Sequence, residues 1–176
     1  MTVTGIISQH RQKVNKTKSK VDRPWKIKYL GFSFYQAKGK IEIRIHPKLI
    51  AKFKDKIREI TSRSNAMSME VRYFKLKQVI VGWVNYFKIA NMGKIAQKLD
   101  EWIRRRIRMC YWKQWKKIKT KHDNLTKLGI NNYKAWEFAN TRKSYWRISN
   151  SPILAMSLNN KTLKKLGYTS LTSVYC

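Results

Sequence analysis

The segment LDEWIRRRIRMCYWKQWKKIKTK, residues 99–121, decides the fold of this chain, because it combines strong basic charge with an uninterrupted helical pattern. Ten basic side chains and only two acids lie between Lys98 and Lys121. Neither proline nor glycine interrupts the run, which predicts a single long helix over residues 94–119. Such a helix would extend roughly 39 Å at 1.5 Å per residue, long enough to lie along a stretch of nucleic acid.

The charge of the whole chain points to a polyanionic partner. Its 176 residues include 40 lysine and arginine residues against 9 aspartate and glutamate residues, a formal net charge of +31. Such a chain repels itself at neutral pH unless a polyanion binds it, so nucleic acid is the first partner to expect. No stretch is long and apolar enough to span a membrane, and residues 1–12 lack the pattern of a signal peptide. The two cysteines lack metal-ligand spacing, and we expect a cytoplasmic protein with no membrane contact.

Alternating residues near the N-terminus predict a β-hairpin. Residues 25–35 alternate in polarity, with Gly31 interrupting the strand, and residues 41–45 alternate again after a turn at residues 36–39. An isolated two-stranded hairpin is only marginally stable, so this one must pack against another part of a protein.

Apolar residues at helical spacing predict that the rest of the chain is helical. One helix is expected to begin at Pro47, and a second to run from the N-cap Ser68 to Ala90. With the long helix they form a three-helix bundle. Several shorter helical segments follow residue 121. The fold class is therefore mainly α, with an N-terminal β-hairpin, a three-helix bundle and a small helical C-terminal module.

The long helix has two different sides when its residues are placed 100° apart. Arg106 falls on the apolar side, and the sequence shows no partner for it. The opposite side carries Arg104, Arg108, Tyr111 and Trp115. Arginines with interleaved aromatic residues suit contact with phosphates and stacking on bases. The alternative is that Tyr111 and Trp115 belong to the core against the C-terminal module, and that the arginines form a solvated face.

The residues contain no pattern typical of a catalytic site. The acids are scattered except for Asp100 and Glu101, which are adjacent, do not share a helix face, and are expected on the helix surface. The three histidines have no ligand spacing, and no glycine-rich phosphate-binding loop is present. We therefore expect binding rather than catalysis, with no catalytic residue, no metal and no cofactor.

Three parts of the sequence carry motifs that can be compared with known families. The first is KVNKTKSKVDRPWKIKYLGFSFY at residues 13–35, and the second combines GWVNYF at 82–87, LDEWIRRR at 99–106 and WKQWK at 112–116. The third consists of AW at 135–136, ANTRK at 139–143, YWRI at 145–148 and SPIL at 151–154. Together they resemble the C-terminal part of a group II intron reverse transcriptase/maturase. In order, they are similar to the last reverse-transcriptase block, the maturase-specific domain (domain X, or thumb) and the DNA-binding region.

This resemblance implies a division of the chain and a set of partners. Residues 1–46 would be the end of a reverse-transcriptase palm, residues 47–121 the thumb-like bundle, and residues 122–176 a DNA-binding-like module. In this family the intron RNA performs splicing itself, and the protein grips that RNA and stabilises its active fold. The implied partners are group II intron RNA, with target DNA and a separate palm chain as further ones.

The helix pattern and the resemblance together give three sets of candidate site residues. The RNA-binding set comprises Arg104, Arg105, Arg108, Tyr111, Trp112, Lys113, Trp115, Lys116 and Lys117. The hairpin residues expected near a primer terminus are Tyr29, Leu30, Gly31 and Phe32. The DNA-binding-like set comprises Arg142, Lys143, Trp146 and Arg147.

One feature of the family is absent from the sequence. The Tyr-x-Asp-Asp block that supplies the metal-binding aspartates of the polymerase is missing, so the chain alone is expected to have no polymerase activity. Residues 1–12 do not resemble what normally precedes residue 13, which indicates a truncated copy or a fragment completed by another piece. The favoured function is an RNA-binding maturase fragment that assists intron folding and splicing. The alternatives are part of a split reverse transcriptase completed by a palm chain, or an inactive remnant.

Overall fold

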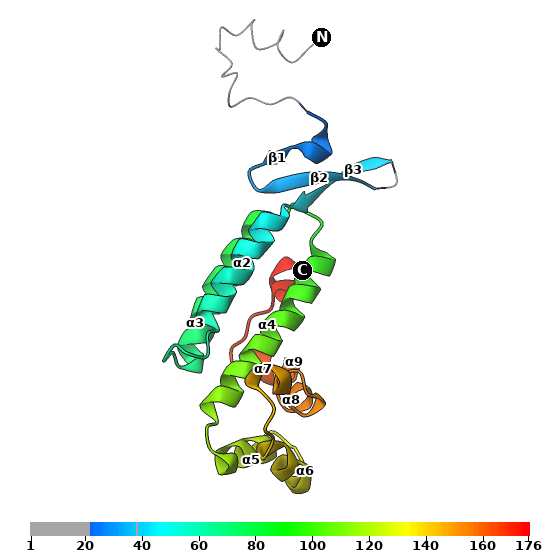
Figure 1. Cartoon of the computed structure of the whole chain (residues 1–176). Coiled ribbons are helices and arrows are strands. Elements are labelled where there is room, and N and C mark those ends of the chain that lie inside the picture. The colour runs from blue at the N-terminus through cyan, green and yellow to red at the C-terminus, as the bar shows by residue number, and fades with distance from the viewer. Residues whose placement is uncertain (1–21, 38) are drawn as a thin grey trace, which may run out of the picture.

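A computed structural model describes residues 22–37 and 39–176. The molecule is mainly helical, with a small sheet at one end, α5 and α6 at the other, and α4 running between them (Figure 1). This arrangement confirms the expected fold class. The part of the first motif that precedes residue 22 lies outside the described residues.

The N-terminal sheet has three antiparallel strands, β1 (Lys28–Tyr29), β2 (Phe32–Ala37) and β3 (Lys40–Ile45), in the order β1-β2-β3. The expected hairpin is confirmed as β2 and β3, with Phe32 opposite Ile45. The expected single strand over residues 25–35 is wrong. Residues 24–26 form a 3-10 helix, η1 (Pro24–Lys26), and the chain turns back at Leu30 and Gly31.

Gly31 is required at this turn for two reasons. Its φ of 88° and the φ of 47° at Leu30 lie in the left-handed region, as a two-residue hairpin turn of the type I′ class demands. A Cβ on Gly31 would also overlap the side chain of Leu49 and touch Phe87. The turn therefore brings the sheet onto the first two long helices.

Three long helices form the bundle: α2 (Pro47–Ile60), α3 (Met69–Phe87) and α4 (Gly93–Gln114). The helix starts agree with the sequence, because His46 accepts a hydrogen bond from the Lys48 amide and Ser68 accepts one from the Val71 amide. The expected end of the second helix at Ala90 is wrong, since α3 ends at Phe87.

The long helix is shorter than the pattern predicts. Residue 119 was its expected end, but α4 ends at Gln114, and Trp115 leaves the helical conformation with a ψ of 60°. The Trp115 side chain is only 8% exposed and packs edge-on against Trp112, with ring centroids 6.0 Å apart. Burial of this large ring in the core offsets the loss of the helical hydrogen bonds that a continuous helix would make.

Six short helices follow the break: α5 (Ile118–Lys127), α6 (Asn132–Ala139), α7 (Tyr145–Ile148), α8 (Pro152–Ser157), α9 (Asn160–Lys165) and α10 (Leu171–Tyr175). Side-chain caps start two of these helices, because the side chains of Ser151 and Asn159 accept hydrogen bonds from the Leu154 and Thr162 amides. The short-helix pattern of this region is thus confirmed.

One hydrophobic core runs through the sheet, the bundle and the short helices. It includes Ile57 of α2, Ile80 of α3, Ile103 of α4, Leu125 of α5 and Leu171 of α10, all 0% exposed. The boundary expected at residue 121, between the thumb-like bundle and the C-terminal module, falls inside α5. It therefore does not coincide with the end of a helix.

Candidate nucleic-acid interface

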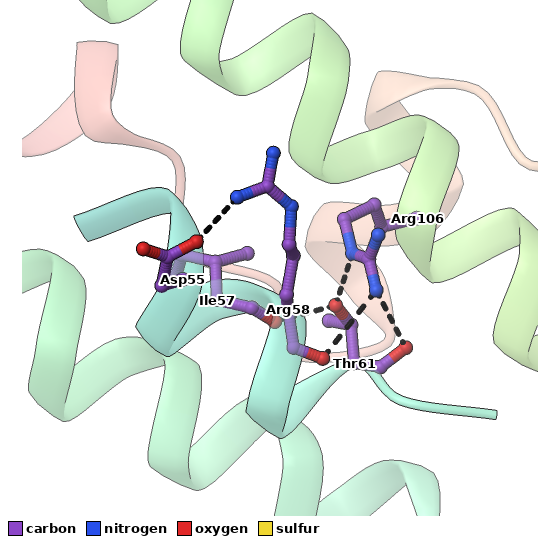
Figure 2. A network of polar contacts seen from close by, with 5 residues as sticks. All are labelled: Asp55, Ile57, Arg58, Thr61 and Arg106. Atoms are coloured by element: carbon purple, nitrogen blue, oxygen red, sulfur yellow. Dashed lines mark hydrogen bonds and ion pairs between the residues drawn. The ribbon is translucent and has the colours of Figure 1, made fainter. Parts of the chain in front are cut away.

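Arg106, which had no visible partner in the sequence, binds the C-terminal end of α2 (Figure 2). Its Nε donates a hydrogen bond to Thr61 Oγ1, and its Nη2 lies 3.4 Å from the carbonyl oxygens of both Arg58 and Thr61. Thr61 Oγ1 in turn donates to the carbonyl of Ile57. Burial lowers the pKa of the Arg106 guanidinium. The carbonyl-rich end of a helix carries partial negative charge, which stabilises this cation without a carboxylate.

Arg72 of α3 binds the same end of α2 and was not among the candidate residues. It is 3% exposed, and its guanidinium donates to the carbonyl oxygens of Ile60 and, at 3.1 Å, Asn65. In the sequence, Arg72 lies next to Tyr73, which belongs to the apolar stripe of the helix. This position could have indicated that Arg72 is buried. Arg72 and Arg106 therefore hold the bundle together at this point.

The aromatic residues at the end of α4 and just after it pack in the core, as the alternative interpretation expects for Tyr111 and Trp115. Trp112 is 2% exposed and Trp115 is 8% exposed, so neither ring presents a face to RNA, and the expectation that they stack on bases is wrong. Tyr111 is half-buried, and its hydroxyl accepts a hydrogen bond from the Tyr73 hydroxyl at 3.1 Å. Burial raises the pKa of both phenols.

Arg105 is engaged by the protein itself. Its guanidinium carbon lies 3.9 Å from the ring centroid of Trp146, and its Nη2 donates to the Trp146 carbonyl at 3.0 Å. This contact joins a residue of the RNA-binding set to one of the DNA-binding-like set. It therefore connects α4 to α7, a structural role that sequence spacing could not show.

Arg104 and Arg108 line two adjoining pockets beside α9. Arg104 and Lys164 line a pocket of about 480 Å³, and Arg108 and Lys161 line a pocket of about 380 Å³. Asn160 lines both pockets, so together they form one continuous surface. We call it the α4–α9 groove and define it by its four cationic side chains, Arg104, Arg108, Lys161 and Lys164.

The positive charge of the α4–α9 groove is not neutralised within the described residues. None of its four cations forms an ion pair with a carboxylate in that part of the chain. Arg108 is held by a hydrogen bond from its Nε to the Leu158 carbonyl at 3.2 Å. Burial lowers the pKa of the Arg108 guanidinium, and the neighbouring Arg104 charge lowers it further. The Ser170 hydroxyl lines the same surface, so it offers both cationic and neutral donors to an anion.

Asp100 is buried, and the expectation that it lies on the helix surface is wrong. It is 1% exposed, whereas its neighbour Glu101 is exposed. Its Oδ1 accepts hydrogen bonds from the Tyr168 hydroxyl at 2.9 Å and the Leu171 amide at 2.8 Å. Its Oδ2 accepts from the Thr172 amide at 3.0 Å and the Thr172 hydroxyl at 2.8 Å. Asp100 therefore attaches the first turn of α10 to α4, beside the α4–α9 groove.

The remaining lysines of the RNA-binding set lie elsewhere. Lys113 is half-buried, with its ammonium 5.2 Å from the ring centroid of Tyr145, and Lys116 and Lys117 are exposed. Lys113 and Lys116 line a pocket beside the loop between α2 and α3, not the α4–α9 groove. The structure thus divides the set between two locations.

The hairpin set lies at the sheet end of the molecule. Phe32 packs against the rings of Tyr86 and Phe87, and Gly31 is buried. Tyr29 and Leu30 are each 65% exposed. These two residues belong to an apolar surface rather than a basic one.

The DNA-binding-like set surrounds the connection between α6 and α7. Arg142, Lys143 and Arg147 are exposed, and Trp146 is 38% exposed beneath Arg105. Tyr133 on α6 is 79% exposed. This region combines exposed cations with an exposed aromatic ring, a combination suited to single-stranded nucleic acid.

The helical bundle has a counterpart among known families. The family model described as group II intron, maturase-specific domain, matches residues 50–129. The chain therefore carries a group II intron maturase-type region, a region associated with maturase function in splicing, and this region implies group II intron RNA as a partner. A search of curated proteins finds no match. Among the described helices, none combines the length and the apolarity that a membrane crossing requires.

Proposed function

We propose that this protein binds group II intron RNA through the α4–α9 groove and assists the folding and splicing of that RNA without performing chemistry. The observation that carries the proposal is the position of Arg104 and Arg108. Both lie within the segment that matches the maturase-specific domain, and both line a groove with four cations and no paired carboxylate among the described residues.

The physical role of such a protein is to neutralise phosphates where RNA segments approach one another. Arginine is suited to this task because its planar guanidinium donates to two phosphate oxygens at once. The binding of a folded RNA in preference to its unfolded form stabilises the folded form by mass action. The intron RNA then supplies the catalytic groups in a cytoplasmic setting.

The affinity of the wild-type protein for intron RNA is expected to fall steeply with salt. The logarithm of the binding constant should decrease by roughly 0.7 to 0.9 per phosphate neutralised, for each tenfold increase in salt concentration. Four groove cations thus predict a slope of about −3 or steeper, measured by fluorescence anisotropy at several salt concentrations. An affinity that hardly changes with salt would contradict the proposed function.

A second candidate function is favoured by the apolar surface at the sheet end. Tyr29 and Leu30 are each 65% exposed, Ile89 is 66% exposed and Tyr86 is 54% exposed. The Tyr86 hydroxyl donates to the Leu30 carbonyl at 3.0 Å, so these segments lie side by side. A cluster of this kind is typical of a protein-binding site. Under this candidate, a separate palm chain docks there and the two chains form a polymerase.

Leu30→Asp combined with Ile89→Asp tests the second candidate. The two carboxylates should abolish co-elution with a palm chain in size-exclusion chromatography, because they would be buried unpaired in the interface. RNA binding through the α4–α9 groove should be unchanged. If the wild-type protein and a palm chain elute separately, the split-polymerase candidate is wrong.

The DNA-binding-like set supports a further part of the proposal. Arg142, Lys143 and Arg147 extend the positive charge beyond the α4–α9 groove, with Tyr133 available for stacking. We therefore assign target DNA to this region as an additional partner, separate from the RNA held along α4.

A further inference from the structure

A second cationic pocket lies between the α2–α3 loop and the C-terminal half of α4. Its volume is about 300 Å³, and we call it the α2–α3 pocket. Four cations from different segments line it: Arg63 from the loop, Arg72 from α3, Lys113 from α4 and Lys116 from the segment after α4. No aspartate or glutamate is among its lining residues.

The cations of the α2–α3 pocket lack acidic partners within the described part of the chain. Arg63 and Lys113 both approach the ring of Tyr145, at 5.1 Å and 5.2 Å from its centroid. Arg72 is 3% exposed, and its Nε has no hydrogen-bond acceptor among the described residues. Cationic side chains gathered without acidic partners repel one another, so the pocket favours an anion that supplies negative charge.

The α2–α3 pocket and the α4–α9 groove lie on opposite sides of α4. Arg104 and Lys113 are nine residues apart, so at 100° per residue they project in opposite directions from the helix. Figure 1 shows α2 and α3 on one side of α4 and α8 and α9 on the other. A straight RNA segment that occupies the groove therefore cannot also occupy the pocket.

We propose that the α2–α3 pocket binds a backbone phosphate of a second RNA segment, so that the protein holds two RNA segments, one on each side of α4. This inference rests on the proposed function and extends it. Arg63 and Lys113 are the accessible donors, and Arg72 supplies fixed positive charge at the base of the pocket. A protein that joins two segments stabilises the tertiary arrangement of an RNA more than the α4–α9 groove alone does.

The double substitution Arg63→Gln with Lys113→Gln tests the pocket. Both side chains make only ring contacts in the described structure, so the fold should persist. The salt slope for intron RNA should become shallower by about 0.7 to 0.9, because the contact with one phosphate is lost. The matched control is Lys52→Gln with Lys77→Gln, which removes the same charge from exposed positions on α2 and α3 and should leave the slope close to that of the wild type. If the pocket variant behaves like this control, the inference is wrong.

A nuclear magnetic resonance titration tests whether the pocket acts independently of the groove. The Nε–H signal of Arg72 should shift when oligouridylate is added, both in the wild type and in the variant Arg104→Gln with Arg108→Gln. No shift of this signal at saturating RNA would overturn the inference. Failure of the proposed function is distinguishable, because the groove variant Arg104→Gln with Arg108→Gln would then bind intron RNA as tightly as the wild type.

Discussion

Replacement of Asp100 by alanine is expected to lower the free energy of unfolding by about 3–5 kcal/mol, because several buried hydrogen-bond donors lose their acceptor at once. The carboxylate accepts four hydrogen bonds from Tyr168, Leu171 and Thr172. Alanine would leave two backbone amides and two hydroxyl groups without an acceptor, and each such group costs about 1–3 kcal/mol when it stays buried. Urea denaturation followed by tryptophan fluorescence measures the change.

Glu101→Ala is the matched control for this substitution. Glu101 is the next residue of α4 and is exposed, so its removal should change the free energy of unfolding by no more than about 0.5 kcal/mol. Equal effects of the two substitutions would contradict the role assigned to Asp100. Because α10 and the residues before it line the α4–α9 groove, Asp100→Ala should also weaken RNA binding in conditions where the bundle stays folded.

The variant Arg104→Gln with Arg108→Gln is expected to bind intron RNA about 10- to 100-fold more weakly than the wild type. Each substitution should cost about 0.7–1.4 kcal/mol of binding free energy, within the usual net range of about 0.5–1.5 kcal/mol for a hydrogen bond, because glutamine still offers a neutral amide donor to phosphate. The salt slope should become shallower by about 1.4 to 1.8, since two phosphates are no longer neutralised. Anisotropy titrations at several salt concentrations give both quantities.

The control for the groove variant removes equal charge elsewhere. Lys52→Gln with Lys77→Gln should keep most of the affinity, because these lysines lie on α2 and α3 outside both cationic sites. Circular dichroism checks the fold, since loss of the hydrogen bond from Arg108 to the Leu158 carbonyl should cost only about 1 kcal/mol. If the two double variants bind RNA equally well, the RNA surface is not the α4–α9 groove.

The starts and ends of most helices depend on nearby residues, and the sequence predicts them well. His46 and Pro47 start α2, Ser68 starts α3, and Ser151 with Pro152 starts α8. A cap forms between residues two or three positions apart, so no knowledge of the rest of the fold is required. The apolar stripe of α2, with Phe53 and Ile57 buried, follows from helical periodicity in the same way.

The candidate site was only partly predictable. Arg104 and Arg108 were found from their spacing on one helix face, but Lys161 and Lys164 were missed because they lie about 55 residues further along the chain. The sequence places Trp112 and Trp115 in the RNA-binding set, but the structure buries both rings. The local sequence around a tryptophan is the same whether its indole ring is buried in a core or exposed for stacking on bases. Only the packing of the surrounding helices determines whether the ring is buried.

Local sequence patterns are enough to predict the class of fold, several helix caps and the excess of positive charge, and they carry the match to a maturase-specific domain. Only the tertiary structure decided where the long helix ends, that Asp100 is buried under α10, and that Arg106 binds the end of α2. The physical reason is the distance along the chain between partners. Asp100 is satisfied by groups about 70 residues away and Arg106 by groups about 45 residues away, and no local pattern encodes contacts that form only when the core is assembled.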